Sequence, residues 1–279
     1  MTTKEDLEHN IRALGLGPGD HVVVHTSLRK VGHVDGGPRA LLDAFLDVLG
    51  PEGTVLVPTF TYSFSGRPGT DPFDRWSTSG SRTGIFAETV RTDPRAFRSA
   101  HPTHSVAAIG ARAQEFTEGH ESISALGIGS PMHKAAVAGG YILLVGVTHN
   151  RNSSIHVGEV LADAPYIREH FCEDWKRTAR VVREDGQIEE VPLHPEIPGC
   201  SAGFDIIDGP LRTRGVIKDG KIGNAYSMLM KGLEMLAVVQ EVLEEHPALL
   251  LCDNLGCDVC TRRKAVTGAA VARRQMSRS

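Results

Sequence analysis

Two short apolar strands separated by one amphipathic helix lie within residues 21–58, and this pattern constrains the fold of the chain most. His21–His25 and Thr54–Pro58 have the length and the valine content of buried β-strands. The apolar residues between them recur at helical spacing, as Leu41, Leu42, Phe45, Leu46 and Leu49. Because the connections are short, we expect the two strands to be parallel neighbours in a βαβ unit.

The remaining pattern predicts an α/β protein with a mixed, largely parallel sheet that is flanked by helices. Tyr141–Val147 is an apolar run typical of a further buried strand. Within residues 165–230, Asp185-Gly186 and Asp219-Gly220 are hairpin signals between strand-like runs, so we expect an antiparallel β region added to the core. Ala248–Leu251 is expected to form a late strand.

Composition favours a single domain over residues 1–260. The chain has 279 residues, of which 41% are hydrophobic, so one large core can form. The charged start Met1–Asp6 is not typical of a signal peptide, and no apolar run reaches the length of a membrane span. We therefore expect a cytoplasmic protein that does not act on membranes, and the composition is compatible with a homodimer.

Charge is unevenly distributed along the chain. Residues 261–279 contain six basic residues and no acidic one, and we expect this tail to be disordered. Residues 1–260 then hold 24 basic against 34 acidic residues, an excess that would repel nucleic acid and attract cationic small molecules. A solvated acidic surface is the alternative explanation.

His156 and Glu159 form the first candidate site, just beyond the Tyr141–Val147 strand. Residues 152–154 are good N-cap residues, so His156 would lie in the first turn of a helix with Glu159 on the same face. The positive end of the helix dipole would keep the ring neutral and usable as a general base, and the carboxylate would fix its tautomer. The alternative is a partly buried helix histidine beside a surface glutamate.

The loop Ser27–Gly37, between the first strand and the next helix, is the second candidate site. It combines a hydroxyl, two cations and three glycines. Its backbone amides could face a phosphate, with Arg29 or Lys30 adding positive charge. The loop matches neither the dinucleotide fingerprint nor a P-loop, and an ordinary βα loop is the alternative.

Two polar segments are further candidates for a binding site. The segment Thr61–Gly80 is long for a loop, and loops of this length are usually functional or disordered. Its aromatic residues Phe64, Phe73 and Trp76 favour an ordered loop that covers a substrate. His101–Ser105 precedes a strand, and a His-Pro turn on the surface is the alternative to a site there.

The five cysteines do not indicate a disulfide framework, because their number is odd and the start of the chain is not a secretion signal. Cys252, Cys257 and Cys260 could hold a structural zinc ion if Cys200 or a histidine supplied a fourth ligand. Because no second Cys-x2-Cys pair exists, free thiols are favoured over zinc.

Several of these segments together resemble the aminoglycoside 3-N-acetyltransferase (antibiotic N-acetyltransferase) family. The motifs occur in family order over about residues 5–245 and are jointly far more specific than any one of them. They are His25–Gly32, Val57–Tyr62, Arg98–Gly110, Leu126–Pro131, Asn152–Glu159 and Pro198–Ser201. The resemblance implies a mixed α/β fold unrelated to the common acetyltransferase superfamily. It also implies acetyl-CoA as donor, an amine as acceptor, and no metal required for catalysis.

The resemblance also implies roles for individual residues, although Gly158 departs from the alanine that family members commonly carry, and the cysteine-bearing C-terminus lies outside the pattern. The CoA phosphates would contact Ser27, Leu28, Arg29, Lys30, Val31 and Gly32. The pantetheine arm would contact His104, Ser105 and Val106. His156 would be the base with Glu159 beside it, and Tyr62 would face the acceptor. Acidic residues that would suit a polycationic acceptor are Asp71, Asp74, Asp163, Glu173 and Asp174.

Together these observations predict direct acetyl transfer from acetyl-CoA to the 3-amino group of the deoxystreptamine ring of an aminoglycoside. His156 would take the proton as the amine attacks the thioester, and donors near Ser105 would hold the oxyanion. Three alternatives remain open. They are the same chemistry on a biosynthetic amine, a cysteine-dependent acyltransferase that uses Cys172 or Cys200, and a protein that binds CoA without turning over an amine.

Overall fold

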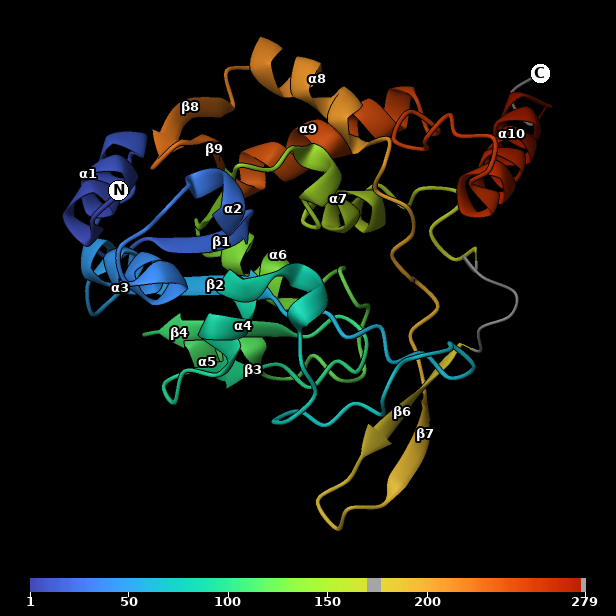
Figure 1. Cartoon of the computed structure of the whole chain (residues 1–279). Coiled ribbons are helices and arrows are strands. Elements are labelled where there is room, and N and C mark those ends of the chain that lie inside the picture. The colour runs from blue at the N-terminus through green and yellow to red at the C-terminus, as the bar shows by residue number, and fades with distance from the viewer. Residues whose placement is uncertain (170–176, 277–279) are drawn as a thin grey trace.

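A seven-stranded sheet forms the centre of the computed structural model, which describes residues 1–169 and 177–276 (Figure 1). Its strands lie in the order β3-β4-β2-β1-β5-β9-β8. Their bounds are β1 His21–Thr26, β2 Thr54–Pro58, β3 Phe97–Arg98, β4 Val106–Gly110, β5 Tyr141–Val145, β8 Ile217–Ile222 and β9 Ala225–Lys231. A separate two-stranded sheet pairs β6 Thr178–Val182 with β7 Ile188–Pro192.

The main sheet is mixed, and its parallel part is confined to three central strands. β1 pairs in parallel with β2 on one side, as the βαβ pattern predicted, and with β5 on the other. The remaining four pairings are antiparallel. The α/β class is confirmed, but the expectation that the sheet is largely parallel is wrong. An apolar run identifies a buried strand and says nothing of its direction, because the side chains face the same layers either way.

Helices cover both faces of the sheet. One face carries α1 Lys4–Leu14, α3 Gly37–Leu49 and α4 Ile85–Arg91. The other carries α5 Ala113–Thr117, α6 Pro131–Val137, α7 Ile155–Leu161, α8 Asp208–Thr213 and α9 Gly232–Glu245. Short helical turns are α2 Leu28–Val31, η1 Ser81–Thr83, η2 His149–Arg151 and η3 Phe204–Ile207. Successive β1 residues alternate between the layers, since Val22 and Val24 pack on one face and Val23 on the other.

Local sequence signals set the ends of several helices. α1 begins with a capping box, in which the Thr3 hydroxyl accepts from the Asp6 N–H and the Asp6 carboxylate accepts from the Thr3 N–H. Gly15 ends α1 with a left-handed φ of 110°. α6 begins with Ser130 as its N-cap and Pro131 in its first turn. Among the described residues, no helix is both long and apolar enough to cross a membrane.

The region predicted as an antiparallel addition divides into two parts. β6 and β7 form a hairpin that projects from the body of the molecule, with Asp185-Gly186 in its turn (Figure 1). β8 and β9 instead extend the main sheet beside β5. Asp219-Gly220 lies inside β8 rather than in the turn, which falls at residues 223–224. The β6–β7 hairpin is bridged to the loop after β2, from Phe64 to Ala179 and from Phe73 to Val181.

Two expectations for the C-terminal region are wrong. Residues 248–251 form turns rather than a strand, with Leu250 and Leu251 buried. The basic tail is not disordered over residues 261–276, because these residues belong to the helix α10 Asp258–Met276. Arg263 is buried on this helix and donates to the carbonyl of Ile197 over 2.8 Å. We expected a solvated tail because it is basic. Composition alone does not reveal that one of its arginines, Arg263, has a buried hydrogen-bond partner.

Candidate functional site

The loops that follow β1 and β5 meet, because these two strands are parallel neighbours. The backbone N–H of Ser27 donates to the carbonyl of Val145 over 2.9 Å. Gly146 has a φ of +64°, and a Cβ atom there would lie 2.5 Å from the Cβ of Lys30. Glycine therefore allows the close approach of the two loops. β2 and β5 lie on opposite sides of β1, and such a divergence of connections is where α/β proteins bind ligands.

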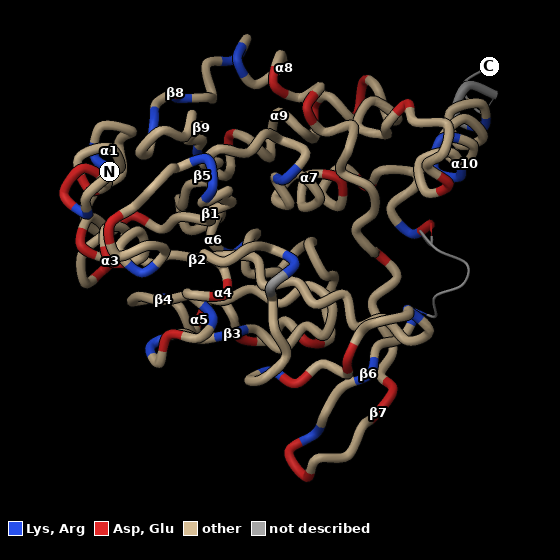
Figure 2. Tube along the Cα trace, in the orientation of Figure 1, with Lys and Arg blue, Asp and Glu red and all other residues tan. Residues whose placement is uncertain are grey.

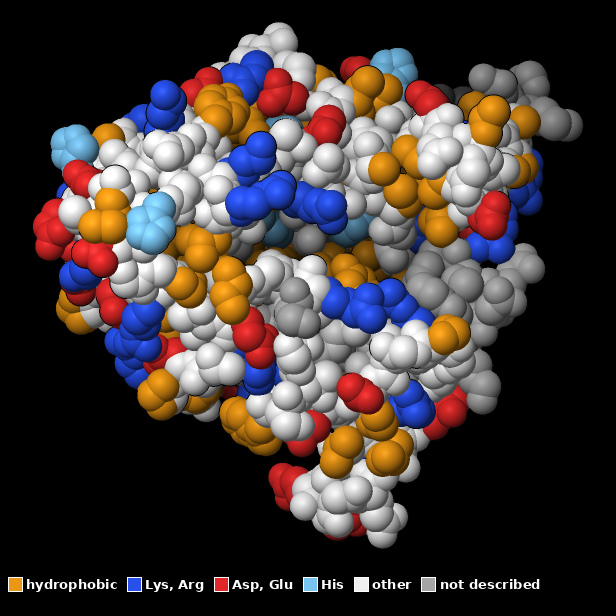
Figure 3. Space-filling model, in the orientation of Figure 1, with side chains coloured by type: hydrophobic (Ala, Val, Ile, Leu, Met, Phe, Trp, Pro, Cys, Tyr) orange, Lys and Arg blue, Asp and Glu red, His pale blue; other side chains and the backbone are white. Residues whose placement is uncertain are grey.

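A cleft of about 720 Å³ opens at this point. Its lining includes Arg29 after β1, Arg82 before α4 and Arg151 after β5. Figure 3 shows Lys and Arg side chains on both sides of the hollow. Figure 2 shows acidic residues on α1, α3 and the β6–β7 hairpin. Within the described part of the chain, no acidic side chain lines the cleft. The cleft is therefore positively charged and suits an anionic ligand such as a phosphate.

His156 and Glu159 are in contact on α7, as their spacing predicted. The Nδ1 atom of His156 is 2.5 Å from Oε2 of Glu159, and Oε1 of the same carboxylate accepts a 2.7 Å hydrogen bond from Tyr166. Burial raises the pKa of Glu159, but the charge of His156 and the hydrogen bonds outweigh burial and hold this pKa below its ordinary value. The ionised carboxylate therefore accepts from Nδ1–H, so Nε2 carries the lone pair when the imidazole is neutral.

The His156 ring adjoins the cleft without forming part of its lining. It is 5% exposed and lies edge-on to Phe204, with 4.8 Å between ring centroids. Ser153 does line the cleft, and its carbonyl accepts from the backbone N–H of His156 over 3.2 Å. α7 has only seven residues, so the dipole expected to keep His156 neutral is short, and Glu159 opposes its effect on the ring.

Gly158 allows α7 to pack closely on α9. A Cβ atom at this position would lie 2.4 Å from Cγ1 of Val239, well inside the sum of the van der Waals radii. The glycine that departs from the common family residue is therefore explained by the approach of these two helices. It lies directly beside Glu159 in the chain, so the packing of α9 also sets the position of the carboxylate.

The predicted donor loop divides into two parts. Ser27–Arg29 lines the cleft. Lys30 packs against Gly146, and Val31 is fully buried. Gly32 has a φ of +95°, a left-handed conformation that favours glycine. The first three residues therefore face the space where a ligand would bind, and the last three hold the shape of the loop.

Ser105 and Val106 are fully buried and do not line the cleft. The Ser105 hydroxyl accepts a 3.0 Å hydrogen bond from Nε of Arg98 and donates to the carbonyl of Thr59 over 2.8 Å. Arg98 is itself buried and also donates to the Thr59 carbonyl over 3.0 Å. Ser105 therefore supports the loop after β2, and in this arrangement its hydroxyl is not free to hold an oxyanion.

His104 is a buried neighbour of both Tyr62 and His156. Tyr62 lines the cleft with a left-handed φ of 54°, and its ring lies edge-on to that of His104 at 5.1 Å. Burial, and then the charge of nearby His156, lower the pKa of His104 well below its ordinary value. The ring of His104 is therefore neutral at physiological pH and packs behind Tyr62 in the aromatic wall of the cleft.

The acidic residues considered for an acceptor do not line the cleft. Asp71 is exposed, and Asp74 accepts hydrogen bonds from the backbone of Trp76–Ser77. Asp163 forms a 2.9 Å ion pair with Arg168 at an exposed position. The remaining two candidates, Glu173 and Asp174, fall outside the described residues.

Several residues that line the cleft were not singled out from the sequence. They are His25, Arg82, Arg151 and Ser201. Burial lowers the pKa of His25 to about 4, and within the described residues its Nε2 has no hydrogen-bond partner. His25 lies two residues before Ser27, at the start of the motif His25–Gly32, which was a usable signal. Ser201 ends the motif Pro198–Ser201, but no local pattern marks Arg82 or Arg151, because their loops meet only in the folded chain.

Solved structures identify the class of enzyme to which this fold and site belong. The structure matches aminoglycoside acetyltransferase AAC(3)-IVa in complex with a gentamicin with a TM-score of 0.80 and 26% identity, covering 95% of this chain and 97% of that chain. It matches AAC-IIIb in a binary complex with CoASH with a TM-score of 0.75 and 30% identity, covering 87% of this chain and 96% of that chain. The protein is accordingly an acyltransferase.

The sequence comparisons narrow this class to one family. The family model for aminoglycoside 3-N-acetyltransferase matches residues 23–244. Aminoglycoside N(3)-acetyltransferase VII of Streptomyces paromomycinus is 33% identical over 260 residues, covering 84% of this chain and 88% of that protein. Aminoglycoside N(3)-acetyltransferase IV of a Salmonella species is 29% identical over 249 residues, covering 89% and 90% respectively. The chain therefore belongs to the aminoglycoside 3-N-acetyltransferase family, as its motifs indicated.

Proposed function

We propose that the protein transfers the acetyl group of acetyl-CoA to the 3-amino group of the deoxystreptamine ring of an aminoglycoside. The observation that carries the proposal is the hydrogen-bonded His156–Glu159 pair, which adjoins a cleft lined by three arginines. Family membership supports the reaction class. The related proteins whose structures hold a gentamicin and CoASH support the choice of acceptor and donor.

The donor is proposed to bind along the side of the cleft that is formed by the loop after β1. Ser27–Arg29 would receive the diphosphate of CoA, with Arg82 and Arg151 contributing charge across the cleft. Charge-assisted contacts to phosphate are among the stronger hydrogen bonds in proteins, and arginine suits them because its donors form a planar fork. Lys30, Val31 and Gly32 would act indirectly by holding the loop, and His104 would lie behind the thioester end of the cleft.

The His156 imidazole is proposed to act as the general base. Nδ1–H would remain hydrogen-bonded to Glu159, and Nε2 would accept a proton from the attacking amine as the new C–N bond forms at the thioester carbonyl. Collapse of the tetrahedral intermediate would break the C–S bond and release the CoA thiolate. The thiolate would then take from the imidazolium the proton that came from the amine. Glu159 would stabilise that imidazolium while it exists, because an ionised carboxylate at 2.5 Å favours the charged ring.

The acceptor is proposed to bind on the side of Tyr62 and the loop after β2. Asp71 and Asp74 belong to that loop, and Asp163 follows α7. These carboxylates would contact the outer amino groups of a polycationic acceptor, beyond the positively charged lining of the cleft. On this proposal the anionic donor binds at the positively charged lining of the cleft, and the cationic acceptor contacts the acidic residues beyond it.

Release of the CoA thiol, measured with purified protein and acetyl-CoA, tests the reaction on a panel of aminoglycosides and other primary amines. We expect turnover with aminoglycosides and an acetyl group at the 3-amino position by NMR of the product. His156→Ala should lower kcat by roughly 10²–10⁴-fold while retaining CoA affinity. His9→Ala, at an exposed histidine of α1, is the matched control and should keep full activity.

The alternatives give different results in the same assay. Turnover of other amines in preference to every aminoglycoside would place the enzyme in a biosynthetic role. Binding of CoA without thiol release for any amine would overturn the proposal. Acetylated protein in the absence of acceptor would indicate a cysteine intermediate. Of the two cysteines considered for that role, Cys200 lies 3.8 Å from Cys252, and Cys172 lies outside the described residues.

A further inference from the structure

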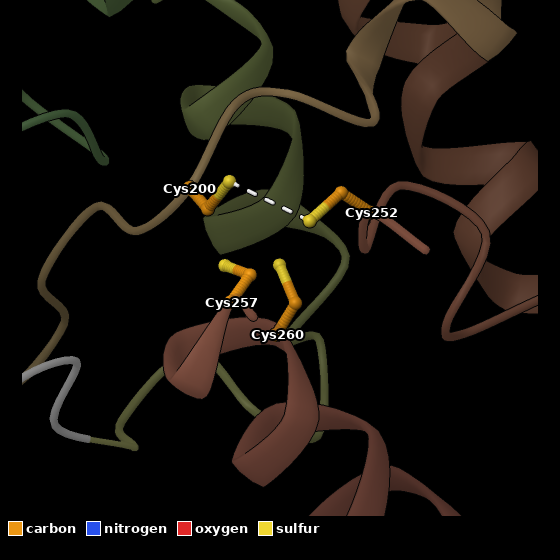
Figure 4. Close-up of side chains that lie close together, drawn as sticks. All are labelled: Cys200, Cys252, Cys257 and Cys260. Carbon is orange, nitrogen blue, oxygen red and sulfur yellow. Dashed lines mark hydrogen bonds between the residues drawn. The ribbon is translucent and has the colours of Figure 1, made fainter. Parts of the chain in front are cut away.

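Four cysteines from three separate segments of the chain converge (Figure 4). Cys200 lies in the loop before η3, Cys252 follows α9, and Cys257 and Cys260 lie at the start of α10. Their Sγ atoms all lie within 4.8 Å of one another, and Figure 4 shows the four sulfurs grouped around one space. Cys252 and Cys260 are buried, and the other two are half-buried. No carboxylate or histidine belongs to this cluster among the described residues.

The spacing of the sulfurs fits a tetrahedral metal site. Zinc–sulfur bonds of about 2.3 Å in a tetrahedron place neighbouring sulfurs about 3.8 Å apart. The Sγ atoms of Cys200 and Cys252 are 3.8 Å apart, whereas a disulfide requires about 2.0 Å. We propose that Cys200, Cys252, Cys257 and Cys260 bind one structural zinc ion as four thiolates. Cys200, which lies 52 residues before Cys252, supplies the fourth ligand that the local cysteine spacing lacked.

The surroundings of the cluster suit four bound thiolates. The backbone N–H of Ala202 donates to the Sγ of Cys200 over 3.4 Å, a contact that stabilises a thiolate. A Cβ atom at Gly203 would lie 2.5 Å from the carbonyl of Leu250, so glycine brings the Cys200 loop close to the Cys252 segment. Lys264 lies one turn after Cys260 on α10, and its positive charge interacts with Cys252 and Cys260 and would offset part of the net negative charge of a zinc ion with four thiolates.

The proposed zinc ion has a structural role rather than a catalytic one. Four protein ligands fill a tetrahedral site and leave no position open for water or substrate. The ion joins the loop before η3, the segment after α9 and the start of α10. α10 in turn places the guanidinium of Arg263 over the ring of Tyr166, at 5.3 Å from its centroid. The metal therefore fixes the helix that supports Tyr166, the hydrogen-bond donor to Glu159.

Metal analysis of untagged full-length protein purified under reducing conditions tests the site directly. We expect about one zinc ion per chain, and a Co²⁺-substituted protein with the absorption of tetrahedral cobalt thiolate. Cys257→Ser should lose the zinc and the cobalt spectrum. Asp253→Asn removes an exposed carboxylate next to Cys252 and should keep both, which makes it the matched control.

Metal removal from the wild-type protein keeps the test independent of the folding of a variant. Treatment with a mercurial thiol reagent should release the ion to a coloured chelator. The unfolding temperature should then fall by about 5 °C or more, and it should recover once excess thiol has removed the mercurial and zinc has been added back. Reduced protein that contains no zinc and binds neither added Zn²⁺ nor Co²⁺ would overturn the proposal. Zinc retained in Cys257→Ser would also overturn it, as would zinc lost equally in Asp253→Asn.

Discussion

The geometry of the candidate site depends most directly on the carboxylate of Glu159. One of its oxygens accepts from His156 and the other accepts from Tyr166, so both oxygens have partners in a buried position. A buried carboxylate with two hydrogen-bond partners has a fixed orientation, and that orientation determines which nitrogen of His156 carries the proton. The catalytic proposal therefore depends on the charge at this position and not only on its shape.

Glu159→Gln should separate charge from shape. The amide keeps the volume of the side chain, but it cannot stabilise an imidazolium, and its NH₂ group facing Nδ1 would place the proton on Nε2. We expect kcat to fall by about 10²-fold or more with little change in CoA affinity. Tyr166→Phe, which removes only the second hydrogen bond of the carboxylate, is the control and should have a smaller effect. Steady-state kinetics with both substrates measure this, and an unchanged kcat in Glu159→Gln would remove Glu159 from the mechanism.

At the scale of elements, two helices hold α7 in place. α9 packs on it at Gly158, and α10 supports the segment after it through Arg263 and Tyr166. The rigidity of the His156–Glu159 pair therefore comes from helices that contribute no residue to the cleft. Substitutions at these contacts are expected to affect stability and activity together.

Gly158→Ala tests the contact between α7 and α9. The added methyl group would meet Val239 at 2.4 Å, so the helices must separate, and overpacking of this kind costs about 1–3 kcal/mol. Gly268→Ala on α10 is the matched control, because a Cβ atom there meets nothing within 4 Å. It should stabilise the protein by up to about 1 kcal/mol through helix propensity. Urea unfolding measures both changes, and a Gly158→Ala protein as stable as wild type would contradict the packing argument.

Arg263→Met tests the support that α10 provides. The variant leaves the carbonyl of Ile197 without its donor and should lower the free energy of unfolding by about 1–3 kcal/mol. The charge of Arg263 also contributes to the lowered pKa of Glu159. Its removal raises that pKa, so the Glu159 carboxyl should titrate at higher pH when it is followed by NMR. Arg273→Met, at an exposed position of the same helix, should change neither quantity, and an unshifted Glu159 titration in Arg263→Met would exclude the electrostatic effect.

The sequence predicted what depends on local spacing and could not predict what depends on direction or on distant contacts. The βαβ unit and the contact between His156 and Glu159 follow from spacing and were found. The antiparallel direction of β4 was missed because an apolar run carries no direction. The pairing of β9 with β5 in the main sheet was missed because no local signal shows which strand a hairpin joins. Arg82 and Arg151 were missed as cleft residues because only the folded chain brings their loops together.

At the scale of the whole molecule, several buried histidines are neutral in the folded protein. His25, His101, His104 and His120 are each at most 4% exposed. Burial lowers the pKa of His25 and His120 to about 4 and that of the other two well below the ordinary value. His120 fits this state, since Nδ1 accepts from Ser99 and Nε2 donates to the carbonyl of Ala125.

Stability should therefore fall as the pH falls from about 6.5 toward 4. In that interval the unfolded chain binds protons at these histidines and the folded protein does not, so each contributes a loss of about 1.4 kcal/mol per pH unit. Above about pH 6.5 both states are neutral, and the full contribution is present. Urea unfolding midpoints across this range measure the slope. His120→Gln should reduce the slope by one histidine's share while His9→Gln leaves it unchanged, and a midpoint independent of pH would contradict the prediction.

The β6–β7 hairpin and the loop after β2 hold each other through bridges at Phe64 and Phe73, outside the main sheet. The donor loop, by contrast, is anchored to the carboxyl ends of the central strands. On the proposed assignment, the length and charge of the β6–β7 hairpin and the loop after β2 can change in evolution without altering the donor loop or the His156–Glu159 pair. A lineage of such enzymes would then diversify in the antibiotics it inactivates far faster than in the thioester it consumes.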